Sequence, residues 1–334
     1  MYLSIMKGLS TLLLLCSTAL LCSAAPAVEP VTCSEDGGAA AARMAAHHID
    51  ENHDHGYKFK LSEIKGNKVE KVDDGCEIEL QLDLLETTCH NINPTHFEDC
   101  MIRFETDRAV MANCSVRMSV RNGDARVRNY HCDTRQGGEM MMICPDCPNL
   151  ISLHDPDGMK SVKEAVQRFN ENTTNQNYFI LKDVGRIKIG WMMMTGSNYW
   201  AEIALVESHC PMGSRILPEA CKPLYPDRAR HAYCRSSYSK SKGLRSVECE
   251  YYPPMNSTAL GDGEREPICR PEDTVGLPPP PAGGVGGPPP PPDQERQRHM
   301  PPFHSFHCHG SDAAIHPICP WPRPEPHGPR LNQE

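Results

Sequence analysis

Two cysteines with only two residues between them enclose a carboxylate near the middle of the chain. The stretch consists of Cys144, Pro145, Asp146, Cys147 and Pro148. Such spacing serves three kinds of chemistry. A redox dithiol needs a thiolate of lowered pKa, commonly at a helix N-terminus, and a structural zinc site needs four ligands, usually from two such pairs. A disulfide between the two cysteines would instead close a small ring and hold the aspartate outward.

The neighbouring residues favour the small ring. Pro148 directly after Cys147 does not suit a redox helix, and the sequence contains a single C-x-x-C pair. Prolines fix φ at about −65°, and Asp146 would be ionised at neutral pH because the reference pKa of aspartate is about 3.9. Such a carboxylate can take the open position of a catalytic zinc ion in another protein and displace the water nucleophile. An interdomain tether whose aspartate only faces water is the alternative on spacing alone.

Two further groups of side chains have the types that bind cations. Glu77, Glu79 and Asp83 alternate with apolar residues and so share one exposed strand face, where carboxylates suit a hard cation such as calcium; a merely solvated strand face is the alternative. Histidines near the C-terminus could hold zinc or copper weakly together with a thiolate, although a His-rich tract often does nothing so specific. That group comprises His299, His304, His307, Cys308, His309 and His316.

The sequence shows no motif of an enzyme. H-E-x-x-H, G-x-S-x-G and phosphate-loop patterns are absent, so we predict no catalytic activity, no cofactor and no metal of the protein's own. The apolar stretch WMMMTG at 191–196 is either an adaptable binding surface or core packing or plain filling of a hairpin.

The N-terminus predicts secretion. Lys7 precedes an apolar run from Leu9 to Leu21 and then small residues up to Ala25, which is typical of a secretory signal peptide over residues 1–25. No later stretch approaches the roughly 20 apolar residues of a membrane-spanning helix. The net charge of −9 and the pI near 6.0 argue against a nucleic-acid partner, which would call for a basic surface. We therefore predict a secreted, extracellular protein.

Cysteines and sequons fit that compartment, because disulfides persist outside the cell. Of the seventeen cysteines, Cys16 and Cys22 lie in the predicted signal peptide, so fifteen remain and at least one lacks a partner within the chain. N-glycosylation sequons are present at Asn113, Asn172 and Asn256.

The spacing of the cysteines shows an internal repeat. Four of them recur about 121 residues later at similar spacing, and residues 47–64 align with 167–184 upstream of each quartet. Local pairing within each quartet predicts the bridges Cys89–Cys100, Cys114–Cys132, Cys210–Cys221 and Cys234–Cys249.

Each unit combines helical and strand periodicity. Apolar residues recur at helical spacing over 41–49 and 162–169. Alternation follows over 57–61, 76–84 and 116–120, and again over 178–184, 199–208 and 244–252. We predict an α+β protein of two tandem units, each with one helix packed on an antiparallel sheet. The units cover 26–143 and 149–253, joined by the linker 144–148, and a Pro/Gly/His-rich tail at 254–334 is predicted to be disordered.

The two quartets, "LETTCH" at 85–90, the C-P-D-C-P linker and the Pro/His-rich tail resemble the fetuins, a branch of the cystatin superfamily. The resemblance covers residues 33–252 and extends to the tail only in composition. The linker is more similar to that of the fetuin-B group than to that of the fetuin-A group. The resemblance implies two cystatin folds, each a long helix cradled by a bent antiparallel sheet.

The same resemblance implies roles for individual residues. It implies a long-range bridge that maps to Cys33–Cys319 and leaves Cys76, Cys269 and Cys308 without family partners. Fetuin-B-like proteins inhibit astacin-type zinc metalloproteases, so Asp146 would ligate the zinc of the target, with the flanking cysteines as clamp and the prolines as stiffeners.

Function is implied in the same way. A role in fertilisation, protecting the egg coat, goes with the fetuin-B group. A fetuin-A-like carrier of calcium phosphate, which the acidic strand face would serve, is the alternative. Inhibition of papain-like proteases is not expected, because neither unit carries the Q-x-V-x-G loop.

Overall fold

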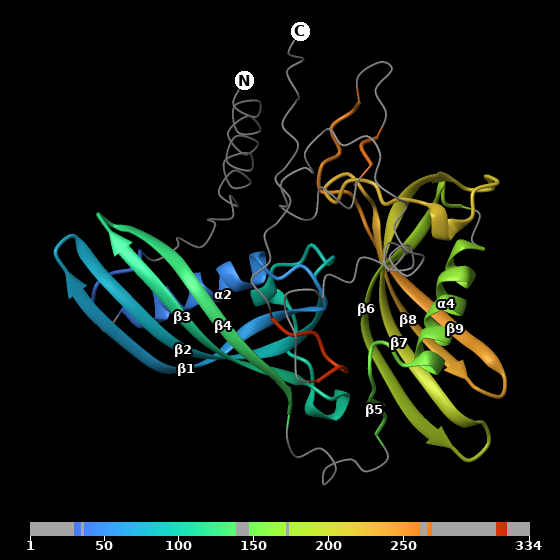
Figure 1. Ribbon diagram of the computed structural model, residues 1–334, viewed down its shortest axis with the longest axis horizontal. Coiled ribbons are helices and arrows are strands. Elements are labelled where there is room, and N and C mark those ends of the chain that lie inside the picture. The colour runs from blue at the N-terminus through green and yellow to red at the C-terminus, as the bar shows by residue number, and fades with distance from the viewer. Residues whose placement is uncertain are drawn as a thin grey trace, which may run out of the picture.

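The computed structural model describes residues 30–34, 37–137, 147–171, 174–260, 266–268 and 312–318. These residues form two units side by side, each with one α-helix against one antiparallel sheet (Figure 1). The predicted α+β class with tandem units is confirmed. Within the described residues, no helix combines the length and the apolar character needed to cross a membrane.

The first unit packs helix α2 (Gly38–Glu51) on a four-stranded sheet in the order β1-β2-β3-β4. Its helix buries a row of small residues, including Ala41, Ala45 and Ala46, so the helix lies close to the leucines of β2. Beyond β2 the chain forms the 3-10 helices η2 (Phe97–Asp99) and η3 (Glu105–Asp107). The strands are β1 (Tyr57–Val72), β2 (Gly75–His90), β3 (Val110–Arg121) and β4 (Asp124–Gln136).

The second unit repeats this plan with α4 (Pro156–Asn170) on a sheet in the order β5-β6-β7-β8-β9. Asp155 caps the helix by accepting a hydrogen bond from the Gly158 amide at 2.8 Å, and Pro156 occupies the first turn, where its missing N–H costs nothing. The short helix η4 spans Pro218–Ala220. The strands are β5 (Asn149–Leu150), β6 (Asn177–Met192), β7 (Gly196–Pro211), β8 (His231–Ser239) and β9 (Gly243–Tyr252).

Apart from the two-residue β5, two strands lie outside the predicted ranges, and both have a weak apolar alternation. In β4 only Tyr130, Cys132 and Thr134 are buried, because this strand forms an edge of its sheet and most of its other side chains are polar. In β8 small serines occupy buried positions such as Ser236 and Ser239, so burial there leaves little trace in hydropathy.

The disulfides follow the predicted local pairs and correct one long-range pair. The structure joins Cys89–Cys100, Cys114–Cys132, Cys210–Cys221 and Cys234–Cys249. It also joins Cys33 to Cys76. The predicted Cys33–Cys319 bridge is therefore wrong, and Cys76 is not left without a partner. Since Cys76 lies near the start of β2 and Cys33 precedes α2, this bridge ties the chain before α2 to the sheet on which the helix packs.

The tail also needs a correction, because residues 312–318 pack against both units. Ala314, Ile315 and Ile318 are at most 7% exposed and belong to the core of the first unit. The Leu153 amide of the second unit donates to the Ala313 carbonyl at 2.9 Å. In Figure 1 this segment is the short red stretch between the units. Disorder throughout 254–334 is therefore a wrong prediction, since 312–318 buries apolar side chains like any core element.

We predict that Ile315→Ala lowers the free energy of unfolding by about 2–4 kcal/mol, because it removes a buried aliphatic side chain and leaves a cavity. Urea denaturation measures the loss. The matched control is Ile268→Ala, since Ile268 is 38% exposed, and it should cost less than about 1 kcal/mol. Equal effects of the two changes would contradict the placement of this segment in the core.

Candidate functional site

The structure describes only the end of the predicted inhibitory linker. Cys144, Pro145 and Asp146 lie outside the described residues, whereas Cys147 and Pro148 lie within them. Cys147 is disulfide-bonded. Every other cysteine in the described ranges pairs within those ranges, so the partner of Cys147 lies outside them. A bonded Cys147 is what the small-ring hypothesis requires, while the pairing with Cys144 stays a prediction.

The end of the linker is held by an arginine of the first unit. Arg108 follows η3 in the left-handed conformation, with φ of 56°. Its Nε donates to the Pro148 carbonyl at 3.2 Å, and its Nη2 donates to the Cys147 carbonyl at 3.4 Å and to Asn149 Oδ1 at 2.5 Å. The guanidinium is largely buried, so these bonds face little competition from water.

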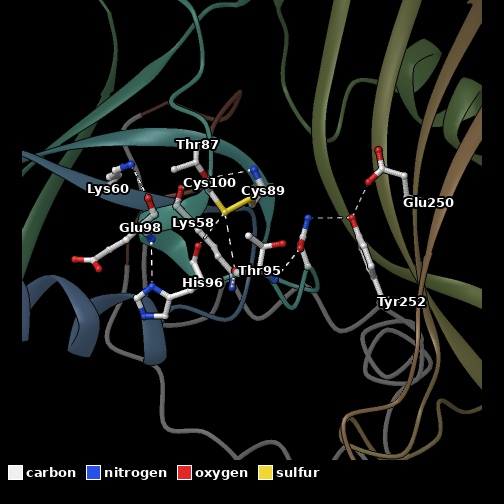
Figure 2. Close-up of a disulfide and its surroundings, with 11 residues drawn as sticks. Lys58, Lys60, Thr87, Cys89, Thr95, His96, Glu98, Cys100, Glu250 and Tyr252 are labelled. Carbon is white, nitrogen blue, oxygen red and sulfur yellow. Dashed lines mark hydrogen bonds between the residues drawn. A yellow bond between two sulfur atoms is a disulfide. The ribbon is translucent and has the colours of Figure 1, made fainter. Parts of the chain in front are cut away.

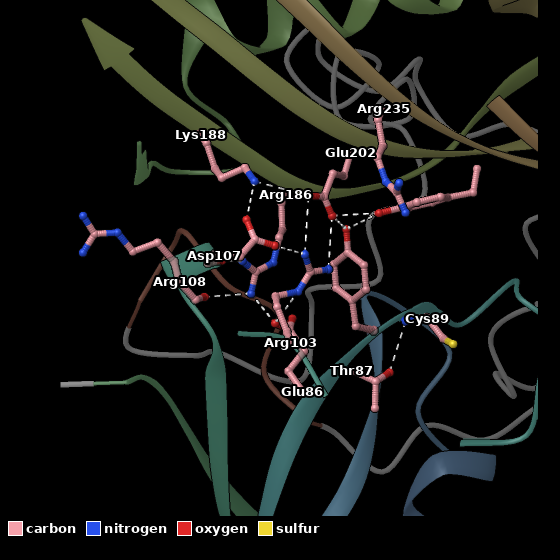
Figure 3. Close-up of polar contacts among 12 residues, drawn as sticks. Glu86, Thr87, Cys89, Arg103, Asp107, Arg108, Arg186, Lys188, Glu202 and Arg235 are labelled. Atoms are coloured by element: carbon pink, nitrogen blue, oxygen red, sulfur yellow. Dashed lines mark hydrogen bonds and ion pairs between the residues drawn. The ribbon is translucent and has the colours of Figure 1, made fainter. Parts of the chain in front are cut away.

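Buried ion pairs connect the two units next to Arg108 (Figure 3). Arg186 of β6 forms an ion pair with Glu86 of β2, and the two side chains are 2% and 7% exposed. The same guanidinium donates to the backbone carbonyls of Asp107 at 2.7 Å and of Arg108 at 3.0 Å. One arginine of the second unit therefore holds both a strand of the first unit and the turn that carries Arg108.

Glu202 of β7 is a buried carboxylate that the second unit brings to the same contact. Arg103 Nη2 lies 3.1 Å from Glu202 Oε2, and the hydroxyls of Tyr57 and Tyr233 donate to this carboxylate. Burial by itself would raise the pKa of Glu202, but Arg103 and its neighbouring cations hold that pKa well below its usual range. Glu202 is therefore ionised at physiological pH.

The charges of this network balance only across the two units. Asp107 Oδ2 lies 2.5 Å from Arg103 Nη1, and Asp107 Oδ1 lies 2.5 Å from Lys188 Nζ. The first unit has one surplus negative charge in the contact and the second has one surplus positive charge. The members are Glu86, Arg103 and Asp107 from the first unit and Arg186, Lys188 and Glu202 from the second.

Histidines gather around a second buried carboxylate at the same junction. Asp183 of β6 accepts from the Gly56 amide at 2.7 Å and lies 3.2 Å from His90 Nε2. His316 Nε2 donates to the Val184 carbonyl at 2.8 Å and lies 3.6 Å from Asp183 Oδ1. His316 is also a member of the His-rich tail cluster named above, whose metal binding stays a prediction; in the structure its ring lies at this junction.

Metal binding is not supported by the part of the chain that the structure describes, where no group of His, Cys, Asp and Glu residues has a metal-binding arrangement. The remaining members of the predicted tail cluster lie outside the described residues; they are His299, His304, His307, Cys308 and His309.

A loop of the first unit adds a third contact (Figure 2). The Cys89–Cys100 disulfide closes this loop, and Lys60 Nζ donates to the Glu98 carbonyl at 2.6 Å within it. From the loop, Asn93 Nδ2 donates to the Tyr252 hydroxyl of β9 at 3.1 Å. The disulfide therefore stiffens a segment that touches the last strand of the second unit.

In the predicted acidic strand face Glu79 is exposed and Glu77 and Asp83 are half-buried, and the charges of all three are matched by cations. Arg121 Nη2 lies 2.6 Å from Glu77 Oε1, and Arg117 Nε lies 3.3 Å from Glu79 Oε1. Asp83 Oδ2 lies 3.4 Å from Lys65 Nζ. A face on which each carboxylate has a basic neighbour has little net charge, which favours the solvated-face alternative over a calcium surface.

The sequons differ in how the structure describes them. Asn113 is exposed on β3 and its Nδ2 donates to Asp83 Oδ1 at 2.7 Å. Asn256 is exposed beside Asp227, and Asn172 lies outside the described residues. Glycosylation of all three stays a prediction.

The WMMMTG stretch forms the tip of the β6–β7 hairpin and is not core. Trp191, Met193 and Met194 are 70%, 89% and 91% exposed. The hairpin tip lies near the linker, because a Cβ on Gly190 would come within 3.5 Å of Pro148 Cγ. The end of the linker and an exposed apolar tip are thus neighbours on one edge of the second unit.

The junction between the units is not predicted by the sequence patterns. Its members were visible only as charges inside apolar strands, such as Glu202 between Ala201 and Ile203. A charged residue in a buried strand needs a partner, and that signal could have marked Glu202 and Glu86. It could not have identified the partner, which comes from the other unit.

Comparison with known proteins supports the resemblance to fetuins in sequence. No protein-family model matches the chain. Alpha-2-HS-glycoprotein of Oryctolagus cuniculus is 28% identical over 226 residues, which make up 66% of this chain and 61% of the relative. Antihemorrhagic factor cHLP-B of Gloydius brevicauda is 32% identical over 215 residues, 63% of this chain and 62% of the relative. The match spans less than two thirds of the length of these relatives.

Solved structures show the same fold. Mouse fetuin-B matches with a TM-score of 0.53 and 23% identity, over 67% of this chain and 70% of that one. It also matches as found in an inhibitory complex with human meprin beta, with a TM-score of 0.53 and 22% identity over 68% and 74% of the two chains. In complex with crayfish astacin the values are 0.50 and 21%, over 66% and 72%.

The fold is therefore the two-unit cystatin-like fold of fetuin-B. Sequence and structure comparisons together show that the chain is similar to fetuins. They distinguish the predicted fetuin-B group only weakly, because the alpha-2-HS-glycoproteins are fetuin-A proteins whereas the structural neighbours are fetuin-B.

We predict that Arg186→Met lowers the free energy of unfolding by about 3–5 kcal/mol, because it leaves the buried Glu86 carboxylate without this counter-ion. Chemical denaturation measures the change. The matched control is Arg168→Met, which removes an exposed pair with Glu171 and should cost less than about 1 kcal/mol. A loss of similar size in both variants would show that the buried pair has no special weight.

The histidines predict a loss of stability in mild acid. Burial lowers the pKa of His53 to about 3 and that of His231 to about 3, whereas unfolded histidine titrates at about 6.5. The unfolded chain then binds more protons between these two values, so the stabilising contribution is complete above pH 6.5 and is lost as the pH falls toward 3. Each such histidine contributes a slope of up to about 1.4 kcal/mol per pH unit.

Chemical denaturation at a series of pH values between about 7.5 and 4.5 measures this slope. His53→Leu should reduce this slope by the contribution of about one bound proton. The substitution breaks no side-chain hydrogen bond, because neither ring nitrogen of His53 has a hydrogen-bond partner. Protonation of Asp183 does not obscure the result, because the pKa of this carboxyl is lowered and lies below the pH range of the measurement. An unchanged slope in the variant would contradict the prediction.

Proposed function

We propose that this chain is a secreted, N-glycosylated fetuin and an inhibitor of astacin-type zinc metalloendopeptidases, with Asp146 as the ligand of the target's catalytic zinc. The observation that carries the proposal is the anchored linker: Cys147 is disulfide-bonded and its carbonyl accepts from a buried arginine. The fold supports it, since mouse fetuin-B has this fold and has been solved in complex with crayfish astacin and in an inhibitory complex with human meprin beta.

The chemistry of inhibition follows from the type of residue in the linker. A catalytic zinc keeps three protein ligands and one open position, which accepts a carboxylate oxygen. Occupation of that position by Asp146 excludes the water that would attack the substrate. A stiff linker between two fixed units loses little conformational freedom on docking, so more of the contact energy remains as affinity.

Other surfaces extend the same proposal. The exposed hairpin tip with Met193 and Met194 lies near the end of the linker and would meet the target beside its active-site cleft. The physiological role that accompanies this activity is protection of the egg coat from proteolysis during fertilisation. Calcium phosphate binding is the second candidate because of the alpha-2-HS-glycoprotein relatives, but the cation-matched acidic face does not favour it.

We predict that Asp146→Ala weakens inhibition of a purified astacin-type protease by about 30-fold or more, because truncation of one partner in a buried charged contact costs about 2–5 kcal/mol. The inhibition constant of the secreted, folded protein is the measurement. Asp124→Ala is a matched control: its carboxylate is 61% exposed in the β3–β4 turn, and its loss should leave inhibition unchanged.

Delay of calcium phosphate precipitation is measured on the same samples. Inhibition that persists in Asp146→Ala would refute the zinc-ligand role. Absence of inhibition together with delayed precipitation would replace the proposal by the mineral carrier.

A further inference from the structure

We propose that Arg108 is the positioning residue of the inhibitory linker: it anchors the linker's C-terminal end to the junction between the two units and thereby sets where Asp146 is presented. This inference rests on the proposed function, because positioning matters only if Asp146 meets a target. Arg108 belongs to the first unit, whereas the residues it binds lead into the first strand of the second.

The guanidinium of Arg108 contacts acceptors on consecutive residues of the linker end. The Arg108 guanidinium donates to the carbonyls of Cys147 and Pro148 and to Asn149 Oδ1, at 3.4, 3.2 and 2.5 Å. A planar guanidinium offers five donors in fixed directions, which a lysine cannot reproduce. The three acceptors belong to consecutive residues, so the bonds restrain the direction of the backbone as well as its place.

Arg108 is itself held from the opposite unit. Arg186 Nη2 donates to the Arg108 carbonyl at 3.0 Å, and Lys188 Nζ lies 2.5 Å from Asp107 Oδ1 in the same turn. Both cations are on β6, the strand that also pairs with β5, where Asn149 lies opposite Ile189. The same strand therefore fixes the clamp and the segment that the clamp binds.

This arrangement restrains the residue next to Asp146. Cys147 directly follows Asp146 in the chain, and its carbonyl is bound by Arg108. Without the guanidinium, the strand pairing that holds this segment would begin only at Asn149, where the short β5 pairs with β6. The segment could then pivot at β5, and docking on a target would require ordering it again.

The backbone of Arg108 suggests the variant that isolates its side chain. With φ of 56°, this residue is in the left-handed region, which asparagine tolerates better than most residues. Arg108→Asn keeps that backbone and is too short to reach the linker carbonyls. Arg108→Lys keeps the positive charge but lacks the forked guanidinium with its fixed donor directions. The matched control is Arg128→Asn, because Arg128 is an exposed arginine of the same unit whose Nε donates to Ser119.

The test combines an inhibition constant with amide hydrogen exchange over residues 147–151 in the full-length protein. In Arg108→Asn we expect inhibition of the astacin-type protease to weaken roughly 10-fold and exchange in this segment to accelerate, while Arg128→Asn changes neither. Arg108→Lys should lie between wild type and Arg108→Asn. If Arg108→Asn matches the Arg128→Asn control in both readouts, the inference is overturned.

Two further outcomes remain decisive. If Arg108→Asn does not fold, Asn149→Ala removes one acceptor of the clamp at an exposed position, and the same two readouts decide. If the wild-type protein does not inhibit at all, the proposed function fails separately. Exchange alone then tests the clamp: faster exchange in Arg108→Asn supports the anchoring, and unchanged exchange overturns it.

Discussion

The buried ion pairs between the two units are the constraint on which the rest of the structure depends. An uncompensated charge in a protein interior costs several kcal/mol, and each unit brings to this contact one surplus charge that only the other unit balances. Glu86 is neutralised by Arg186 from the other unit, and Glu202 by Arg103. Separation of the units would expose or strand these groups together, so the two sheets keep a fixed relation without a covalent bridge among the described residues.

That fixed relation gives the linker its geometry. The turn at 105–108 is bound by Arg186 and Lys188 of β6, and Arg108 of this turn binds the end of the linker. The interface between the units and the anchor of the linker therefore use the same turn. The histidines around Asp183 are a second part of the same junction, and burial lowers the pKa of His53 and of His90 there, which ties its stability to pH. Residues 312–318 cover it with Ile315 in the core of the first unit and His316 against the second.

The repeat explains how one plan yields two different surfaces. Glu86 and Glu207 occupy equivalent positions before the first cysteine of each quartet. Glu207 pairs with Arg230 inside its own unit, whereas Glu86 pairs across the junction. Tyr57 and Tyr178 are likewise equivalent, yet Tyr57 is buried against Glu202 and Tyr178 accepts a bond from the exposed Gly213 amide. Equivalent residues of the two units therefore have different partners, because only one residue of each pair lies at the contact between the units.

The sequence by itself determined the two units, their helices, most strands and the four local disulfides, because these depend on periodicity and on contacts between near neighbours in the chain. It also marked the linker as the place for chemistry. Only the tertiary structure decided that Cys33 bonds Cys76, that 312–318 belongs to the core, and that Arg108 holds Cys147 and Pro148. These contacts join residues far apart in sequence, and no local pattern records which distant partner will satisfy a buried charge or an apolar side chain once the two sheets have met.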